Sequence, residues 1–111
     1  MIEKIVLDYL NSVLDVPVYM ERPEDPDSKY VLLEKTGSGR SNHINRATIA
    51  AQSYALTKYE AAELNEAVKA AMDNIIVLDS IARSALNSDY DFTDTRSKQY
   101  RYQAVYDIVH Y

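Results

Sequence analysis

Apolar residues at helical spacing open the chain. They recur every three or four residues over residues 2–13, the pattern of a helix with one face against a core. The members of this stripe are Ile2, Ile5, Val6, Tyr9, Leu10 and Val13. The helix is expected to end near Asp15, because Val16 precedes Pro17 and a residue before proline is disfavoured in helical geometry.

A second helix is predicted from the residues that begin it. Thr57 and Glu60 have the spacing of a capping box, in which the threonine hydroxyl accepts from the glutamate amide and the carboxylate reaches back. A stripe of small and apolar residues follows, made of Ala61, Leu64, Val68, Ala71 and Met72. The many alanines favour helix and permit close packing on a sheet.

Extended segments account for most of the remaining chain. The predicted strands cover residues 17–21, 30–35, 43–56, 81–87 and 98–111, with loops at residues 22–28, 36–42, 74–79 and 88–95. Pro17 indicates either the beginning of a strand or an edge strand. Residues 30–35 are apolar on both faces as in an interior strand, and residues 98–111 are expected to have a strand on each side. The sequence therefore predicts one α+β domain, residues 1–111, with an antiparallel or mixed sheet of about four to five strands and two helices on one face.

Composition narrows the class of protein. The chain of 111 residues suits one domain and has no cysteine, which excludes disulfides and thiolate metal sites. No apolar run approaches the length of a membrane span. The first residues, Met1 to Val6, lack the basic start and cleavage site of a signal peptide, so the cytoplasm is the expected location.

Charge and aromatic content point to protein contacts. The net charge of −5 gives no basic surplus for phosphate, so specific nucleic-acid binding is not expected. The ten tyrosines, with one Phe and no Trp, are typical either of protein–protein interfaces or of ordinary half-exposed strand positions. Tyr100 and Tyr102 are candidate interface residues; the glycine spacing of an RNA-binding strand is absent around them.

One strand is too long for the domain. Residues 43–56 would span roughly 45 Å if straight, against a domain diameter of about 35 Å. Either a bulge breaks the strand or its glycine-flanked end projects as a hairpin arm. Residues 35–46, the basic arm, contain no acid, and their basic residues are Lys35, Arg40, His43 and Arg46.

An exposed basic arm on an acidic protein suggests a neighbouring copy that receives it. The candidate receivers are the acidic stretches at residues 21–27 and 89–94, and Asp25 and Asp27 are the candidate contact residues. The alternative is a mobile surface hairpin with scattered charge. The sequence therefore indicates a homo-oligomer.

Catalytic and metal sites are not expected. Ser38 lies in Gly37-Ser38-Gly39, which lacks one spacer on each side of the nucleophile motif Gly-x-Ser-x-Gly, and no P-loop lysine follows. The acidic stretches lack the central glycine and final glutamate of a calcium loop, and His43 and His110 are too far apart for a zinc motif. We expect no cofactor and no enzyme activity.

The whole chain resembles the tail-terminator, or tail-completion, proteins of long-tailed phages and prophages. The resemblance rests on the order of patterns: the opening helix leading into Val16-Pro17-Val18-Tyr19, the segment Tyr30-Val31-Leu32-Leu33-Glu34-Lys35-Thr36-Gly37, the long strand from Ala47 to Tyr54, the alanine-rich helix from Glu60, and the closing Tyr100-Arg101-Tyr102-Gln103-Ala104-Val105-Tyr106.

This resemblance implies a ring, typically of six copies, in the virion tail. The ring would cap the tail-tube protein, end tube growth, present a surface to the head-completion protein and let DNA pass through its centre. Assembly would take place in the bacterial cytoplasm, and the family has no catalytic residues to carry over. Two alternatives remain: another head–tail connector such as a head-completion protein, and a cellular dimeric α+β module that binds a small ligand.

Overall fold

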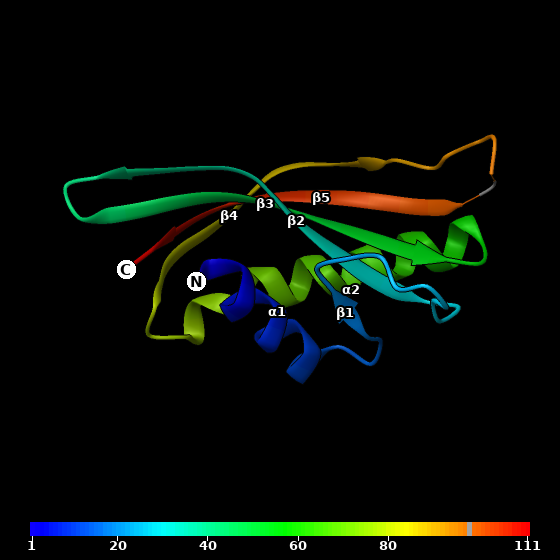
Figure 1. Ribbon diagram of the computed structural model, residues 1–111, viewed down its shortest axis with the longest axis horizontal. Coiled ribbons are helices and arrows are strands. Elements are labelled where there is room, and N and C mark those ends of the chain that lie inside the picture. Colours follow the sequence, from blue (N-terminus) through cyan, green and yellow to red (C-terminus); the bar gives the residue numbers. More distant parts are fainter. Residues whose placement is uncertain (98) are drawn as a thin grey trace.

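The strands form one sheet, and both helices lie on one of its faces, as the computed structural model in Figure 1 shows. The structure describes residues 1–97 and 99–111. In this part of the chain the helices are α1 (Ile2–Val13) and α2 (Lys58–Asp73), with a 3-10 turn, η1 (Ile75–Val77). The strands are β1 (Val18–Tyr19), β2 (Tyr30–Ser41), β3 (Ile44–Ala55), β4 (Ile81–Asp91) and β5 (Tyr100–His110). The α+β class, the mixed sheet and the one-sided helices are confirmed.

The sheet has the strand order β1-β2-β3-β5-β4. β1 is parallel to β2, and every other pair is antiparallel. β1 lies at the edge, as Pro17 indicated, and β5 has a strand on each side, as predicted. The molecule measures 44 × 24 × 24 Å, and its long axis follows the β2–β3 hairpin (Figure 1).

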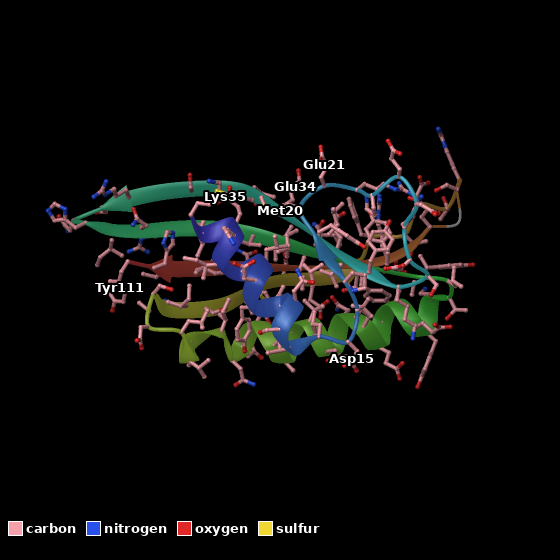
Figure 2. All side chains as sticks on the ribbon, turned by 60° about the horizontal axis from the view of Figure 1, so that its bottom comes forward. Asp15, Met20, Glu21, Glu34, Lys35 and Tyr111 are labelled. Atoms are coloured by element: carbon pink, nitrogen blue, oxygen red, sulfur yellow. The ribbon has the colours of Figure 1, made fainter. Side chains whose placement is uncertain are left out.

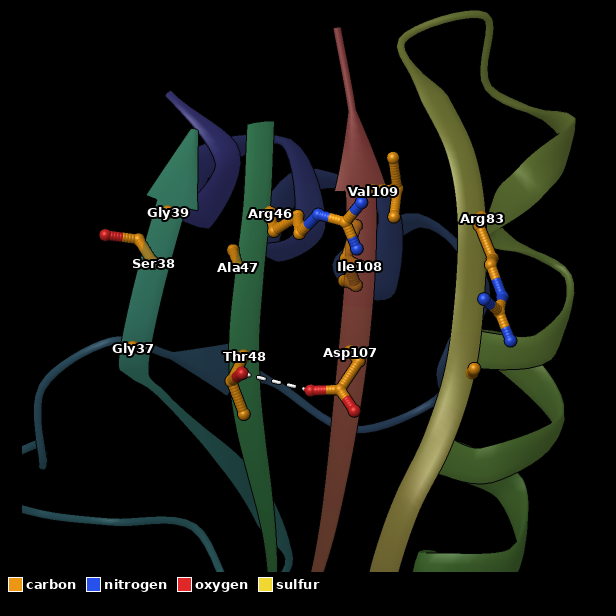
Figure 3. Close-up of a pocket in the computed structure, with 11 residues that line it drawn as sticks. Gly37, Ser38, Gly39, Arg46, Ala47, Thr48, Arg83, Asp107, Ile108 and Val109 are labelled. Atoms are coloured by element: carbon orange, nitrogen blue, oxygen red, sulfur yellow. Dashed lines mark hydrogen bonds between the residues drawn. The ribbon is translucent and has the colours of Figure 1, made fainter. Parts of the chain in front are cut away.

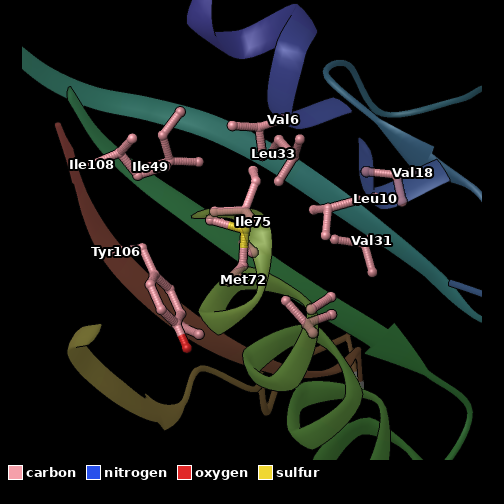
Figure 4. Close-up of a cluster of buried hydrophobic side chains, with 14 of the residues drawn as sticks. Val6, Leu10, Val18, Val31, Leu33, Ile49, Met72, Ile75, Tyr106 and Ile108 are labelled. Carbon is pink, nitrogen blue, oxygen red and sulfur yellow. The ribbon is translucent and has the colours of Figure 1, made fainter. Parts of the chain in front are cut away.

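The core lies between the helices and the sheet (Figure 4). α1 contributes Ile2, Val6 and Leu10, whereas Val13, the last member of its predicted stripe, is 49% exposed. All five predicted stripe residues of α2 are buried. The capping box is confirmed in its main contact, because the Glu60 amide donates to the Thr57 hydroxyl over 3.1 Å.

The predicted glycine turn at residues 36–42 is wrong. β2 runs straight through Gly37 and Gly39, and the chain reverses at Asn42 and His43, whose φ angles are 51° and 67°. A two-residue hairpin of this kind needs positive φ at both central positions, and Asn adopts that region more readily than most residues. The irregularity in the ladder falls in β2, at Thr36 between Lys35 and Gly37.

The predicted polar loop at residues 88–95 begins too early. β4 continues to Asp91, four residues into that segment. Acidic residues fit on this strand because Asp89 and Asp91 each meet a lysine of α2. Lys98, at the start of the last predicted strand, lies outside the described residues, and β5 begins at Tyr100.

Candidate assembly site

The basic arm (residues 35–46) forms the far end of the β2–β3 hairpin. In Figure 1 its turn extends further along the long axis than the nearby chain termini. Arg40, His43 and Arg46 are exposed, with His43 at the turn itself. Arg46 pairs with Gly39 on the helix-free face of the sheet, and Arg40 pairs with Asn45 on the helix side. The arm therefore presents a positive charge on each of its two faces.

Lys35 is held within the chain. Its ammonium lies 3.3 Å from the Glu3 carboxylate, and Figure 2 shows it beside the first turn of α1. The backbone amide of Glu3, together with Lys35, lowers the pKa of Glu3 below its ordinary value. Lys35 thus attaches the base of the arm to α1, while the two arginines further out make no ion pair among the described residues.

The acidic loop (residues 21–27) lies at the opposite end of the hairpin. It leads into Tyr30, which pairs with Tyr54, whereas the arm ends at the Ser41–Ile44 pair. The Arg22 guanidinium donates to Gln99 over 3.3 Å, and the Tyr19 hydroxyl lies 3.5 Å from Asp27. Three further carboxylates of the loop are exposed and have no hydrogen bond or ion pair within the described residues; these are Glu21, Glu24 and Asp25.

The carboxylates of the second acidic stretch, residues 89–94, have partners within the chain. Asp89 accepts from Lys69 and from Asn65, each over 2.6 Å, and Asp91 lies 3.2 Å from Lys58. Asp94 accepts from the Arg96 amide over 3.0 Å. Of the two acidic stretches proposed from the sequence, the loop at residues 21–27 is the one with carboxylates that lack partners within the described part of the chain.

The Asp89 contacts give a stability that depends on pH. Partial burial alone would raise the pKa of Asp89, but the Lys69 and Asn65 hydrogen bonds outweigh it and lower that pKa. A carboxyl with a lowered folded-state pKa stabilises above its unfolded pKa, and the stabilisation is lost as the pH falls through the folded value. Asp89→Asn should therefore cost about 1 kcal/mol of unfolding free energy at neutral pH. Urea titrations from neutral to acid pH should show this difference shrinking, whereas Glu63→Gln should change nothing.

Tyr100 and Tyr102, the candidate interface tyrosines, lie away from the arm. They lie an even number of positions from Tyr106 along β5, so all three side chains lie on the same face. The Tyr106 hydroxyl contacts α2, and this face is therefore the helix side of the sheet. Their partners on β3 are Ala55 and Ser53, at the end where α2 begins. Both side chains are half-buried, and the structure does not bring them together with the basic arm.

An aromatic network on the helix-free face was missed by the sequence analysis. Tyr30 and Tyr54 stack with ring centroids 4.6 Å apart, and the Arg101 guanidinium donates to the Tyr54 hydroxyl over 3.0 Å. The same guanidinium lies 4.4 Å from the centre of the Phe92 ring. These contacts hold the side chains of the helix-free face in place next to the acidic loop. The one sequence signal for this network was the position of Arg101 between Tyr100 and Tyr102, which places Arg101 on the opposite face of the strand from the two tyrosines.

A groove occupies the other end of the helix-free face, next to the arm (Figure 3). Its volume is about 440 Å³, and it crosses from β2 over β3 and β5 to β4. Gly37 and Gly39 lie along one side, with Arg46 over β5 and Arg83 on the opposite side. Arg83 was not predicted, because a single arginine in an alternating strand gives no signal of its own.

Both edges of the sheet leave strand backbone unpaired in the described residues. β1 pairs only with Val31 and Leu32, so in the described residues β2 is paired with β3 alone from Leu33 to Ser41, and its other edge is open there. β4 is the other edge along its full length. Open edges offer backbone groups to another chain.

Among the described residues, no group of three or more His, Cys, Asp or Glu side chains is placed to hold a metal ion. No helix in the described chain has the length and apolarity needed to cross a membrane. The chain matches no protein-family model and no curated protein.

Proposed function

We propose that this chain is a structural protein that assembles head to tail with copies of itself into a ring. The observation that carries the proposal is the separation of two complementary surfaces. The basic arm and the acidic loop lie at opposite ends of a molecule 44 Å long, so one copy cannot join them internally. Contact between different surfaces of successive copies is heterologous, and it closes into a ring when the rotation between copies closes.

The pairing of charge supports this arrangement. The ion pairs within the described residues all use lysine, and none uses arginine. Arginine is the better residue for contacts between proteins, because its planar fork matches a carboxylate and holds water weakly. Arg40 and Arg46 on the arm, with Glu24 and Asp25 on the acidic loop, are then available to a second copy.

We further propose that the ring is a phage tail terminator. This part rests on the resemblance of the sequence pattern, which implies about six copies, a face for the tail-tube protein and a face for the head-completion protein. The net charge of −5 suits a ring through which DNA slides without specific binding. The proposed place of the protein is the virion tail, and its proposed role needs no cofactor and no catalytic residue.

The test adds the purified protein to polymerising tail-tube protein from the genome that carries the chain. Tubes should stop growing and show a ring at one end in negative-stain images. Tubes that grow to the same length with and without the protein would contradict the terminator assignment. A genome with no gene for a tail-tube protein would contradict it as well.

A further inference from the structure

The two glycines of β2 are not required by a turn or by close contacts within one copy. Neither has a positive φ, and a Cβ added to Gly37 or Gly39 meets no atom within 4 Å. Glycine inside a strand lowers stability relative to alanine, because it loses more conformational freedom on folding. In a strand it often marks either a bulge, which here falls at Thr36 beside Gly37, or a place where a ligand or another backbone comes close. The bulge accounts for a glycine at position 37, but Gly39 is regularly paired, so something outside the chain is expected to approach at Gly39.

The chemistry of the groove indicates what approaches. Gly37 and Gly39 are on the helix-free face, directly opposite Thr48 and Arg46. Arg83 lies across the groove, paired with Val109 on the same face. The one carboxylate in the groove, Asp107, already accepts from Thr48 over 3.0 Å and from Asn87 over 2.9 Å. Two arginines without an ion pair among the described residues are left to meet an anionic partner.

We propose that this groove receives the acidic loop of a neighbouring copy, with Arg46 and Arg83 facing Glu24 and Asp25 and with the loop backbone passing over the two glycines. The inference deepens the proposed function, since it names the contact by which the ring is built. It assigns to Gly37, Gly39 and Arg83 a role that the fold does not give them.

The acidic loop suits this place in three respects. Three of its exposed carboxylates lack partners in the described residues, and it lies at the end of the molecule remote from the groove. Pro23 and Pro26 fix part of its backbone and remove two amide donors, so less freedom is lost when the loop docks. Glycine allows this stiff segment to come close to β2, where any side chain on that face would hold it away.

The glycine test separates assembly from folding. Gly39→Val should leave the melting temperature of the chain unchanged or raise it, because valine favours a strand. It should also raise the dissociation constant for self-assembly by at least about tenfold, because its side chain fills the approach. Ser88→Val lies on the same face of the sheet, outside both the groove and the basic arm, places a side chain of the same size there and should assemble normally. Equal assembly by Gly39→Val and the wild type would overturn the proposed contact.

The charge test uses two double variants. Arg46→Glu with Arg83→Glu reverses the groove, and Glu24→Arg with Asp25→Arg reverses the loop. Each variant alone should fail to assemble, because like charges then meet at every contact. An equal mixture should regain assembly, because copies that alternate around a ring bring opposite charges together at every contact. Alternation needs an even number of copies, which a ring of six provides.

The controls make the same type of charge reversal at single exposed residues outside the groove and the loop. Arg96→Glu and Glu63→Arg should each assemble like the wild type. If the wild type assembles and both reversed variants also assemble alone, the groove contact is wrong and the proposed ring stands. If the wild type forms no assembly at any concentration, both are wrong.

Discussion

Reversing Arg40 and Arg46 together to glutamate is expected to abolish ring formation and leave the chain folded. Both side chains are exposed, and neither makes an ion pair or a side-chain hydrogen bond in the described residues, so the fold loses no contact. The change turns the basic arm acidic on both of its faces, and it then repels the acidic loop of the next copy. Light scattering should report the mass of one chain, and circular dichroism should report an unchanged fold.

The salt dependence of assembly provides a second measurement on the same variant. Exposed charges are screened over about 10 Å at moderate ionic strength and over less at high salt. Wild-type assembly should therefore weaken as salt is added, and the double variant should gain from the same addition. Arg96→Glu, the same substitution at one exposed arginine outside the arm, is the control. If the double variant assembles like the wild type at every salt concentration, the arm does not join the copies.

Replacing Leu10 by alanine is expected to give the largest loss of stability of the changes considered. Leu10 is fully buried between α1 and the first strands, beside Val18 and Val31 (Figure 4). Leucine-to-alanine changes at such sites cost about 2–5 kcal/mol, because the transfer energy is lost and a cavity is left. A domain of this size has about 5–15 kcal/mol of stability in all. Urea titration under conditions that keep the protein monomeric measures the loss.

Val13→Ala on the same helix is the control for this prediction. Both residues belong to the stripe that predicted the helix, but Val13 is 49% exposed. A change at an exposed position is expected to cost no more than about 0.5 kcal/mol. Equal losses for the two variants would mean that α1 does not pack on the sheet as described.

The fold was predictable where a local pattern and the tertiary packing agree. The stripe of α2, its threonine cap and the proline at the edge strand each rest on a few neighbouring residues, and all three are found in the structure. The reversal at Asn42 and His43 was not predictable in the same way. Glycines usually mark a turn, but here they lie in extended backbone, and His43 adopts a positive φ that its residue type does not suggest.

The candidate site was predictable in composition but not in geometry. The absence of acids from the basic arm is visible in the sequence. The sequence does not show that Lys35 is paired with Glu3, that Arg40 and Arg46 lie on opposite faces, or that Asp89 and Asp91 are held by lysines of α2. Those facts depend on strand register and on contacts between distant residues. Arg83 joins the groove for the same reason, through the pairing of β4 with β5.

The central claim is that the chain closes on copies of itself in a ring. The most direct test is the molecular mass by light scattering across a concentration series, with negative-stain images of the largest species. The account predicts an assembly of about six chains that appears as a ring with a central hole. A dimer whose mass does not change with concentration would contradict the account and favour the ligand-binding module instead.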